Sequence, residues 1–374
     1  MEFTLKQINL FTLKSHFLFD NAEKSDLVKV VDQICGLNAQ TARAPYISLW
    51  SRIKNFKKDQ LKKALYKDKT LVKTWLMRGT VHIVSARDFP VYQKALRNSL
   101  VGGWERFLKK KEMVLAPREK KKLFQKTLDI LSRKSLTIKE LLPEIKGVLK
   151  GYSEDEEKIF LGRALRALSY LGIICHGEPT GSWYHFKENR FTAVCNQLKG
   201  FDIDKLDEKE AKAKLLLKYL HSYGPASAKD FSYWTGFKAN ESKQIFEEVK
   251  DKLVEIKIKD AFCSLWMLKK DLSSLENINT RKKPPTSFLP EFDSLIMGHK
   301  DKSRIMDDKH RGKVFLPLAG VAPVFLLNGK IKGSWNFKMS DRKIKLSLFE
   351  KTGTGDKSKI EKESKRLKQF IESD

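Results

Sequence analysis

Apolar side chains recur every three or four residues along much of the first 60 positions, as expected for helices packed against a core. One such helix is predicted to end at Gly36, and the next to begin near Pro45, which suits a first helical turn. Residues 37–44 then form a short connector, and it carries two side-chain amides, Asn38 and Gln40. Because alternate residues of an extended segment share a face, both amides are expected to face one site.

The same order of elements recurs along the chain, with helices followed by strands that are joined by a turn. It is found in residues 1–100, 101–204 and 205–280, and it predicts three tandem winged-helix units. Residues 281–374 differ, since short apolar strands and an Asn-Gly turn signal follow a basic, proline-containing linker. They predict a small C-terminal β-barrel with a terminal helix. The expected fold class is therefore α+β.

The charge of the chain indicates what it binds. There are 74 Lys plus Arg against 46 Asp plus Glu, which gives a net charge of +28. Such an excess favours a polyanion, with nucleic acid ahead of a membrane surface. The alternative is a lysine-rich composition spread over ordinary solvated helix faces. The longest apolar stretch, residues 314–327, is too short to span a membrane, and we expect no membrane partner.

Four cysteines are scattered without the spacing of metal ligands, at Cys35, Cys175, Cys195 and Cys263. They are expected to be buried free thiols in a reducing compartment. We therefore expect a cytoplasmic, nucleoid-associated protein. Neither a phosphate-binding loop, a dinucleotide-binding glycine motif nor a nucleophile elbow is present.

Residues 175–186 predict a strand, a turn and a second strand that carry His176, Trp183 and His185. These rings are expected to enter a DNA groove or to stack on a displaced base. Alternatively, they pack on the sheet of the hairpin itself. Elsewhere, His82 lies in a predicted strand and is expected to be structural. Asp293 follows a proline turn, where it is either a helix cap or a general base.

Five segments resemble the winged-helix DNA-binding family that contains the AlkZ-type DNA glycosylases. They are residues 36–52, 75–84, 223–236, 288–305 and 328–335, in the same order along nearly the whole chain. The resemblance implies three tandem winged helices and a β-barrel around a basic DNA channel. It also implies removal of N-alkylated purines, including crosslinked ones, without a metal or cofactor.

The catalytic signature of that family is Gln-x-Gln in the connector. Gln40 matches its second position, whereas Asn38 replaces the first Gln with a side chain one methylene shorter. An N-alkylated purine is already cationic, so the enzyme has mainly to orient a water and stabilise an oxocarbenium-like transition state. Amide oxygens can orient that water, although misplacing one costs on the order of 100-fold. By itself, the amide pair also fits a turn with local hydrogen bonds.

We therefore interpret the chain as a DNA glycosylase that acts on alkylated purines in duplex DNA. The alternative is a non-catalytic winged-helix DNA-binding protein, such as a transcriptional regulator. A monomer bound to damaged duplex DNA is expected. The candidate DNA contacts are basic and aromatic side chains: Arg43, Arg78, Lys109, Lys110, Lys111, Lys120, Lys121, Lys122, His176, Trp183, His185, Lys300, Lys302 and Arg304.

Overall fold

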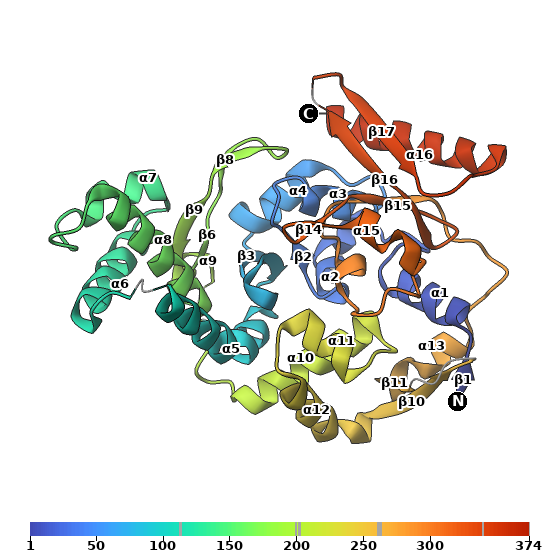
Figure 1. Ribbon diagram of the computed structural model, residues 1–374, viewed down its shortest axis with the longest axis horizontal. Helices are drawn as coiled ribbons and strands as arrows, with labels where there is room; N and C mark the ends of the chain where they lie inside the picture. The colour runs from blue at the N-terminus through green and yellow to red at the C-terminus, as the bar shows by residue number, and fades with distance from the viewer. Residues whose placement is uncertain (112–113, 199, 201–202, 260–263, 339, 374) are drawn as a thin grey trace. The chain divides into compact units, whose positions relative to one another are not determined.

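The protein is described by a computed structural model (Figure 1). The structure describes residues 1–111, 114–198, 200, 203–259, 264–338 and 340–373. The chain forms two compact units. Unit 1 consists of Met1–Lys57, Leu216–Trp234 and Lys238–Asp374, and unit 2 consists of Lys58–Leu215 and Thr235–Phe237. Within the described ranges, we find no helix with both the length and the apolar character that crossing a membrane requires.

Among the described residues, unit 1 contains the connector and three sheets, of which the smallest pairs β13 with β14. Its elements are β1 (Glu2–Phe3), α1 (Leu5–Ser15), α2 (Leu27–Gln33), β2 (Leu37–Asn38), α3 (Ala44–Trp50), α12 (Ala239–Glu248), β10 (Leu253–Ile258), β11 (Ser264–Leu268), α13 (Leu272–Glu276), β12 (Ser287–Leu289), α14 (Ser294–Met297), α15 (Arg311–Val314), β13 (Phe315–Leu316), β14 (Gly320–Val321), β15 (Val324–Leu327), β16 (Lys330–Lys338), β17 (Lys343–Leu348) and α16 (Thr354–Glu372). Helices α10 (Glu208–Tyr223) and α11 (Ala228–Thr235) have residues in both units.

The C-terminal part of unit 1 is an open antiparallel sheet in the order β12-β15-β16-β17. Its outer strands do not pair with each other among the described residues, so the strands do not close into the predicted barrel. Helix α16, drawn in red in Figure 1, lies beside this sheet and buries Ile360, Leu367, Phe370 and Ile371. Helix α16 contacts β12 and β17, the two outer strands of this open sheet.

The turn between β15 and β16 is the one that the Asn-Gly pair predicts. Asn328 and Gly329 have φ angles of 51° and 82°. Positive φ at both central residues is typical of the tight turn whose twist matches two antiparallel strands. A second sheet, in the order β1-β10-β11, joins the N-terminus of the chain to the predicted strand pair 253–268.

Unit 2 is built around strands of one sheet in the order β4-β3-β6-β9-β5. Its elements are α4 (Lys58–Lys62), β3 (Leu71–Trp75), β4 (Val81–Ser85), α5 (Phe89–Lys110), α6 (Pro117–Leu131), β5 (Leu136–Thr137), α7 (Ile138–Leu141), α8 (Glu154–Tyr170), β6 (Ile174–His176), β7 (Thr180–Gly181), β8 (Phe186–Glu188), β9 (Arg190–Ala193) and α9 (Val194–Gln197). Apolar residues of α6, α7 and α8 share a core with β6 and β9. Three helices followed by a hairpin is the order of elements predicted for residues 101–204.

The two units do not coincide with the four predicted segments. Residues 1–100 are divided between the units, and so are residues 205–280. The four-segment division is finer than the compact units and stays a prediction. The sequence analysis also missed strand β3 and the 22-residue helix α5.

Candidate functional site

The connector is extended at Asn38 but bends at Gln40, so the predicted extended geometry reaches only the first of the two amides. Helix α2 ends in two residues with positive φ, Cys35 at 55° and Gly36 at 92°. A glycine adopts such a backbone without steric cost, which explains why the helix stops there. Strand β2 follows, and α3 then begins at Ala44 with Pro45 in its first turn. Residues 38–43, which include Asn38 and Gln40, therefore lie between two helices whose apolar faces are buried.

The two amides of the connector have different environments. Asn38 is 7% exposed, and its Oδ1 accepts a hydrogen bond from the backbone N–H of Gln40 at 3.0 Å. Gln40 itself is exposed. Asn38 therefore closes a local turn, which was the alternative interpretation of the pair. The oxygen of Asn38 accepts the hydrogen bond that closes this turn, and Gln40 is the exposed amide of the pair.

A segment that follows β12 holds this connector from two sides. Glu291 Oε1 accepts hydrogen bonds from Thr41 Oγ1 at 2.8 Å and from Arg43 Nε at 2.9 Å. Ser294 Oγ donates to the carbonyl oxygen of Gly36 at 2.7 Å. The residues that carry the amides thus lie between two anchored points. Arg43, a predicted DNA contact, forms an ion pair within unit 1.

Asp293 is a structural residue and not a general base. Its Oδ1 caps α14 by accepting the N–H of Leu295 at 3.0 Å, which confirms the predicted acidic cap. Its carboxylate also pairs with Arg52 at 2.7 Å and 2.9 Å and accepts from Ser48 at 2.9 Å. Both charged side chains are fully buried. Burial, and then the nearby Arg52 cation, lower the pKa of His16 to about 3, so this imidazole is neutral beside the pair.

Two further predicted DNA contacts of unit 1 turn out to be internal. Lys302 is 1% exposed, and its Nζ donates to the carbonyl oxygens of Ile296 and His299. Arg304 is 5% exposed and donates to the carbonyl oxygen of Pro225 at 2.9 Å. Both cations are buried and donate to backbone carbonyl oxygens, so the DNA role predicted for them was wrong. Lys300 is exposed.

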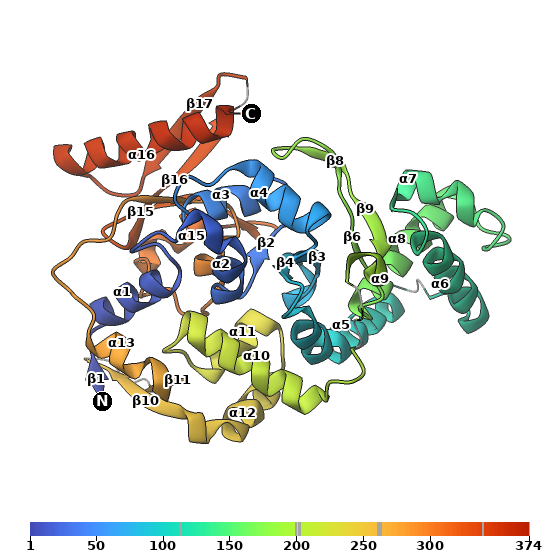
Figure 2. The ribbon, with the colours of Figure 1, turned by 180° about the vertical axis from the view of Figure 1, so that it is seen from behind.

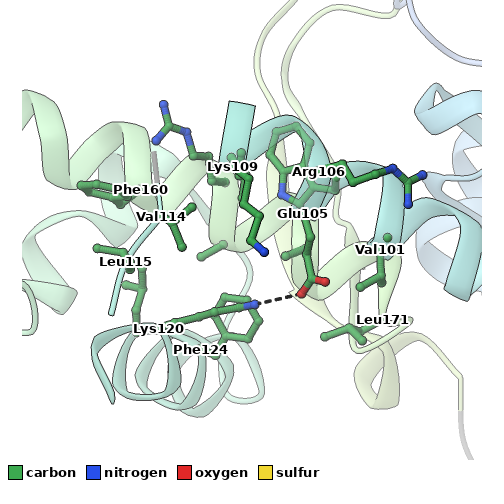
Figure 3. Close-up of a pocket in the computed structure, with 17 residues that line it drawn as sticks. Val101, Glu105, Arg106, Lys109, Val114, Leu115, Lys120, Phe124, Phe160 and Leu171 are labelled. Atoms are coloured by element: carbon green, nitrogen blue, oxygen red, sulfur yellow. Dashed lines mark hydrogen bonds and ion pairs between the residues drawn. The ribbon is translucent and has the colours of Figure 1, made fainter. Parts of the chain in front are cut away.

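The lysine runs of unit 2 lie on its surface. Lys109 and Lys110 are in the last turn of α5, and these two, Lys111, Lys121 and Lys122 are exposed. Lys120 differs, because it pairs with Glu105 at 3.3 Å, and both residues line an apolar cavity (Figure 3). The cavity holds about 640 Å³ between α5, α6 and α8 and includes Phe124 and Phe160 in its wall. The lysines and the cavity belong to unit 2, whereas the connector belongs to unit 1.

The hairpin of unit 2 is longer than predicted. Strand β6 pairs with β9, β7 pairs with β8, and the turn itself lies at residues 182–185, where Ser182 N–H donates to the carbonyl oxygen of His185 at 2.9 Å. Figure 2 shows this turn at the end of the hairpin that is farthest from β6 and β9. Trp183 and His185 are therefore at the tip and not in the returning strand. The ring of Trp183 lies 4.3 Å from Lys58 Nζ, and His185 is exposed.

His176 is not at this tip. It is 2% exposed in β6, with its ring 4.4 Å from that of Trp75 and 5.1 Å from that of Phe191. Burial, and then the cation of Lys73, hold the pKa of His176 well below its usual value. The ring is therefore neutral and covered, and its predicted contact with DNA was wrong. For this residue the alternative, packing on the sheet of the hairpin, is correct.

The remaining predicted residues of unit 2 are half-buried or structural. Arg78 lies between β3 and β4, has a φ of 56° and is half-buried. His82 is buried in β4, its Nδ1 is 2.9 Å from the carbonyl oxygen of Thr80, and burial lowers its pKa to about 3. Its structural role is confirmed. Of the cysteines, Cys35 and Cys175 are buried free thiols and Cys195 is exposed, while Cys263 lies outside the described residues.

Comparison with known proteins identifies the family of this fold and site. A family model described as DNA glycosylase AlkZ-like matches residues 31–370. The chain belongs to the AlkZ-like DNA glycosylase family. An interstrand DNA cross-link repair glycosylase of Streptomyces sahachiroi is 24% identical over 370 residues, which cover 97% of this chain and 95% of that protein. The structure of Streptomyces sahachiroi DNA glycosylase AlkZ has the same fold, with a TM-score of 0.83 at 22% identity over 99% of this chain and 97% of that one.

Sequence reasoning missed the residue that anchors the connector of this AlkZ-like protein. Glu291 is an acid in an otherwise apolar stretch, Leu289-Pro290-Glu291-Phe292. The sequence predictions concerned Asp293, two residues later, and not Glu291. A charged residue among buried neighbours signals an internal partner. The sequence gives no indication that this partner is in the connector, about 250 residues earlier along the chain.

One group of side chains in the described part of the chain has the geometry of a metal site. Asp307, His310 and Glu350 offer ligand atoms within 4.8 Å of one another. Hydrogen bonds from Lys309 and Lys332 lower the pKa of Glu350 to about 2. Because two lysines already offset this carboxylate at 2.6 Å and 2.9 Å, we assign no metal to the group.

Proposed function

We propose that this AlkZ-like protein hydrolyses the N-glycosidic bond of N-alkylated purines in duplex DNA. By analogy with the name of its Streptomyces relative, we include purines joined in interstrand crosslinks. The observation that carries the proposal is the connector, in which an exposed Gln40 follows a buried Asn38 that fixes the backbone of the turn. The family match over residues 31–370 supports it.

The proposed reaction requires the protein mainly to position the attacking water. The alkylated purine carries a positive charge and leaves as a neutral base once its bond to C1′ breaks. Water then adds to C1′ and releases a proton. An amide oxygen that holds this water in place contributes mainly by orientation and by stabilising the positive charge on the sugar. Gln40 is the amide we assign to the water, and Asn38 holds the turn that presents Gln40.

We further propose that unit 2 supplies most of the DNA contacts. Its exposed lysines fit phosphate contacts, which give affinity without sequence information. Trp183 and His185, at the tip of the hairpin, fit stacking on a base that has left the helix. In this proposal α6, α7, α8 and the hairpin act as a winged helix. The protein binds as a monomer to damaged duplex DNA in the cytoplasm, at the nucleoid. Arg43, Arg78 and Lys300 remain candidate contacts.

The test is release of N7-methylguanine from a duplex by the purified protein, detected as alkali-sensitive abasic sites. Gln40→Ala should slow single-turnover excision on the order of 100-fold, because a positioning group is lost. The Kd for DNA and the melting temperature should stay near the wild-type values, since Gln40 is exposed. Absence of base release by the wild-type protein over a panel of alkylated bases would favour the non-catalytic DNA-binding alternative.

The role of Asn38 is tested in the same assay. Asn38→Asp keeps an oxygen that can accept the N–H of Gln40 and should retain most of the excision rate. Asn38→Ala removes that acceptor and should slow excision. Asn38→Gln restores the signature of the family but moves the oxygen by one methylene. A faster Asn38→Gln variant would show that Asn38 is a weakened catalytic position and not a turn residue.

A further inference from the structure

We infer that Glu291 is a positioning residue for the glycosylase reaction, an inference that rests on the function proposed above. Its carboxylate bonds to Thr41, the residue immediately after Gln40. Successive Cα atoms are about 3.8 Å apart, so an anchor on Thr41 fixes where the side chain of Gln40 begins. Glu291 therefore determines where the exposed side-chain amide of Gln40 can be placed.

The anchor is made of short hydrogen bonds between partly buried side chains. The side chains of Arg43 and Glu291 are 18% and 9% exposed, and they meet at 2.9 Å. Hydrogen bonds between ionised groups are shorter and roughly twice as strong as those between neutral groups. With Arg43 on one side of the carboxylate oxygen and Thr41 on the other, the connector is bound at two residues of its second half.

Both hydrogen bonds end on the same atom, Oε1. No protein donor in the described part of the chain reaches Oε2, and this oxygen is buried. Glutamine has the length of glutamate, and its single oxygen can occupy the place of Oε1. Glu291→Gln should therefore keep both anchors, whereas Glu291→Ala removes them. Glu291→Asp withdraws the carboxylate by one methylene, so that it no longer reaches both donors.

The variants are compared by single-turnover excision of N7-methylguanine, with the Kd for the same duplex and the melting temperature measured alongside. Glu291→Ala should slow excision on the order of 100-fold, the effect of a misplacement near 1 Å. Its Kd for DNA should change little. Glu291→Gln should recover most of the rate, and Glu291→Asp should stay slow. Glu276→Gln, at an exposed carboxylate of α13, is the matched control and should equal the wild type.

A second pair of variants leaves Glu291 in place and serves if Glu291→Ala does not fold. Thr41→Ser keeps the hydroxyl that donates to Oε1, and Thr41→Val replaces it with a methyl group of similar size. We expect Thr41→Val to excise more slowly than Thr41→Ser at equal Kd for DNA. Equal rates for these two variants would overturn the inference, because the anchor on Thr41 would then not affect Gln40.

The outcomes separate this inference from the proposed function. If the wild-type protein releases base and folded Glu291→Ala is equally fast, Glu291 only stabilises the fold and the inference fails alone. If Glu291→Gln is as slow as Glu291→Ala, the negative charge acts directly and positioning is again overturned. If the wild-type protein releases no base, the proposed function and this inference fail together.

Discussion

Two sets of cations, one from each unit, have opposite environments. In unit 1, Arg52 and Lys302 are at most 1% exposed, and acceptors of unit 1 bind each of them. In unit 2, the lysines of the two runs at residues 109–111 and 120–122 are mostly exposed. The positive charges behind the net charge of +28 are therefore not spread evenly over a surface that could bind DNA. Some of them are buried inside the fold, and some of them are exposed to solvent.

The largest effect is expected where an internal cation of unit 1 loses its partner. Asp293→Ala leaves the fully buried Arg52 without its carboxylate. Breaking a buried pair in this way costs about 3–5 kcal/mol. The free energy of unfolding in urea measures the loss. The double variant Arg52→Met with Asp293→Leu removes both charges and should lose less. If Asp293→Ala lowered the free energy of unfolding by less than about 1 kcal/mol, the Arg52–Asp293 pair would contribute no more than an ordinary surface ion pair.

Unit 2 also contains buried lysines, and the next prediction concerns one of them, Lys73. Lys73 in β3 is 6% exposed, and its Nζ lies 4.7 Å from the ring centre of Phe186. No ion pair to Lys73 is found among the described residues. Burial lowers its pKa from 10.5 to about 8. Between those two pH values the unfolded chain binds more protons than the folded one, so the free energy of unfolding rises with pH in that interval.

Lys73→Met should therefore be more stable than the wild type at pH 7, by at most about 3 kcal/mol. The gap should shrink as the pH is raised from 8 to 10.5, because the wild type then loses the buried charge. Urea unfolding of both proteins across this interval measures it. A gap that stays constant with pH would mean that the ammonium group is solvated in the folded protein.

Lys73 also shows why part of the fold was missed. Strand β3 reads Leu-Val-Lys-Thr-Trp, and its Lys and Thr are as buried as its apolar residues. A strand buried on both faces gives no alternation of polar and apolar positions, and a lysine in it suggests a surface. Strands with an Asn-Gly turn or clear alternation, such as β10, β15 and β16, were predictable because their local signals agree with their burial.

The candidate site, like the strands, could be predicted only where local sequence signals mark it. Gly36 and Pro45 mark the connector, and the resemblance points to Gln40. The hydrogen bond from Gln40 N–H to Asn38 and the anchor from Glu291 require coordinates, since each depends on where a side chain turns. The same holds for the cations. Sequence shows that Lys302 and Lys121 are lysines, but only packing decides which one meets solvent.

The hairpin tip should show an intermediate effect. Trp183 is half-buried, and it covers Lys58, which is 8% exposed. If the ring leaves Lys58 to stack on a displaced base, Trp183→Ala should weaken binding to distorted duplex by about 1–3 kcal/mol. Intact duplex should be affected less. Fluorescence anisotropy with matched and mismatched duplexes measures both. Equal loss on the two substrates would make the tip a packing element, like His176.

The smallest effect is expected from the surface lysines, and it sharpens the contrast between the units. Lys121→Ala with Lys122→Ala removes two exposed cations of unit 2. If both contact phosphates, the slope of log K against log salt should fall in magnitude by about 1.8, with little change in stability. Lys120→Ala should change the slope less, because Lys120 is already paired with Glu105.

The matched control is Lys362→Ala with Lys365→Ala, two exposed cations of α16 in unit 1. Anisotropy titrations between low and moderate salt measure all three. If the control changed the salt slope equally, phosphate binding would be spread over both units. The contrast between the buried cations of unit 1 and the exposed cations of unit 2 would then not apply to their surface lysines.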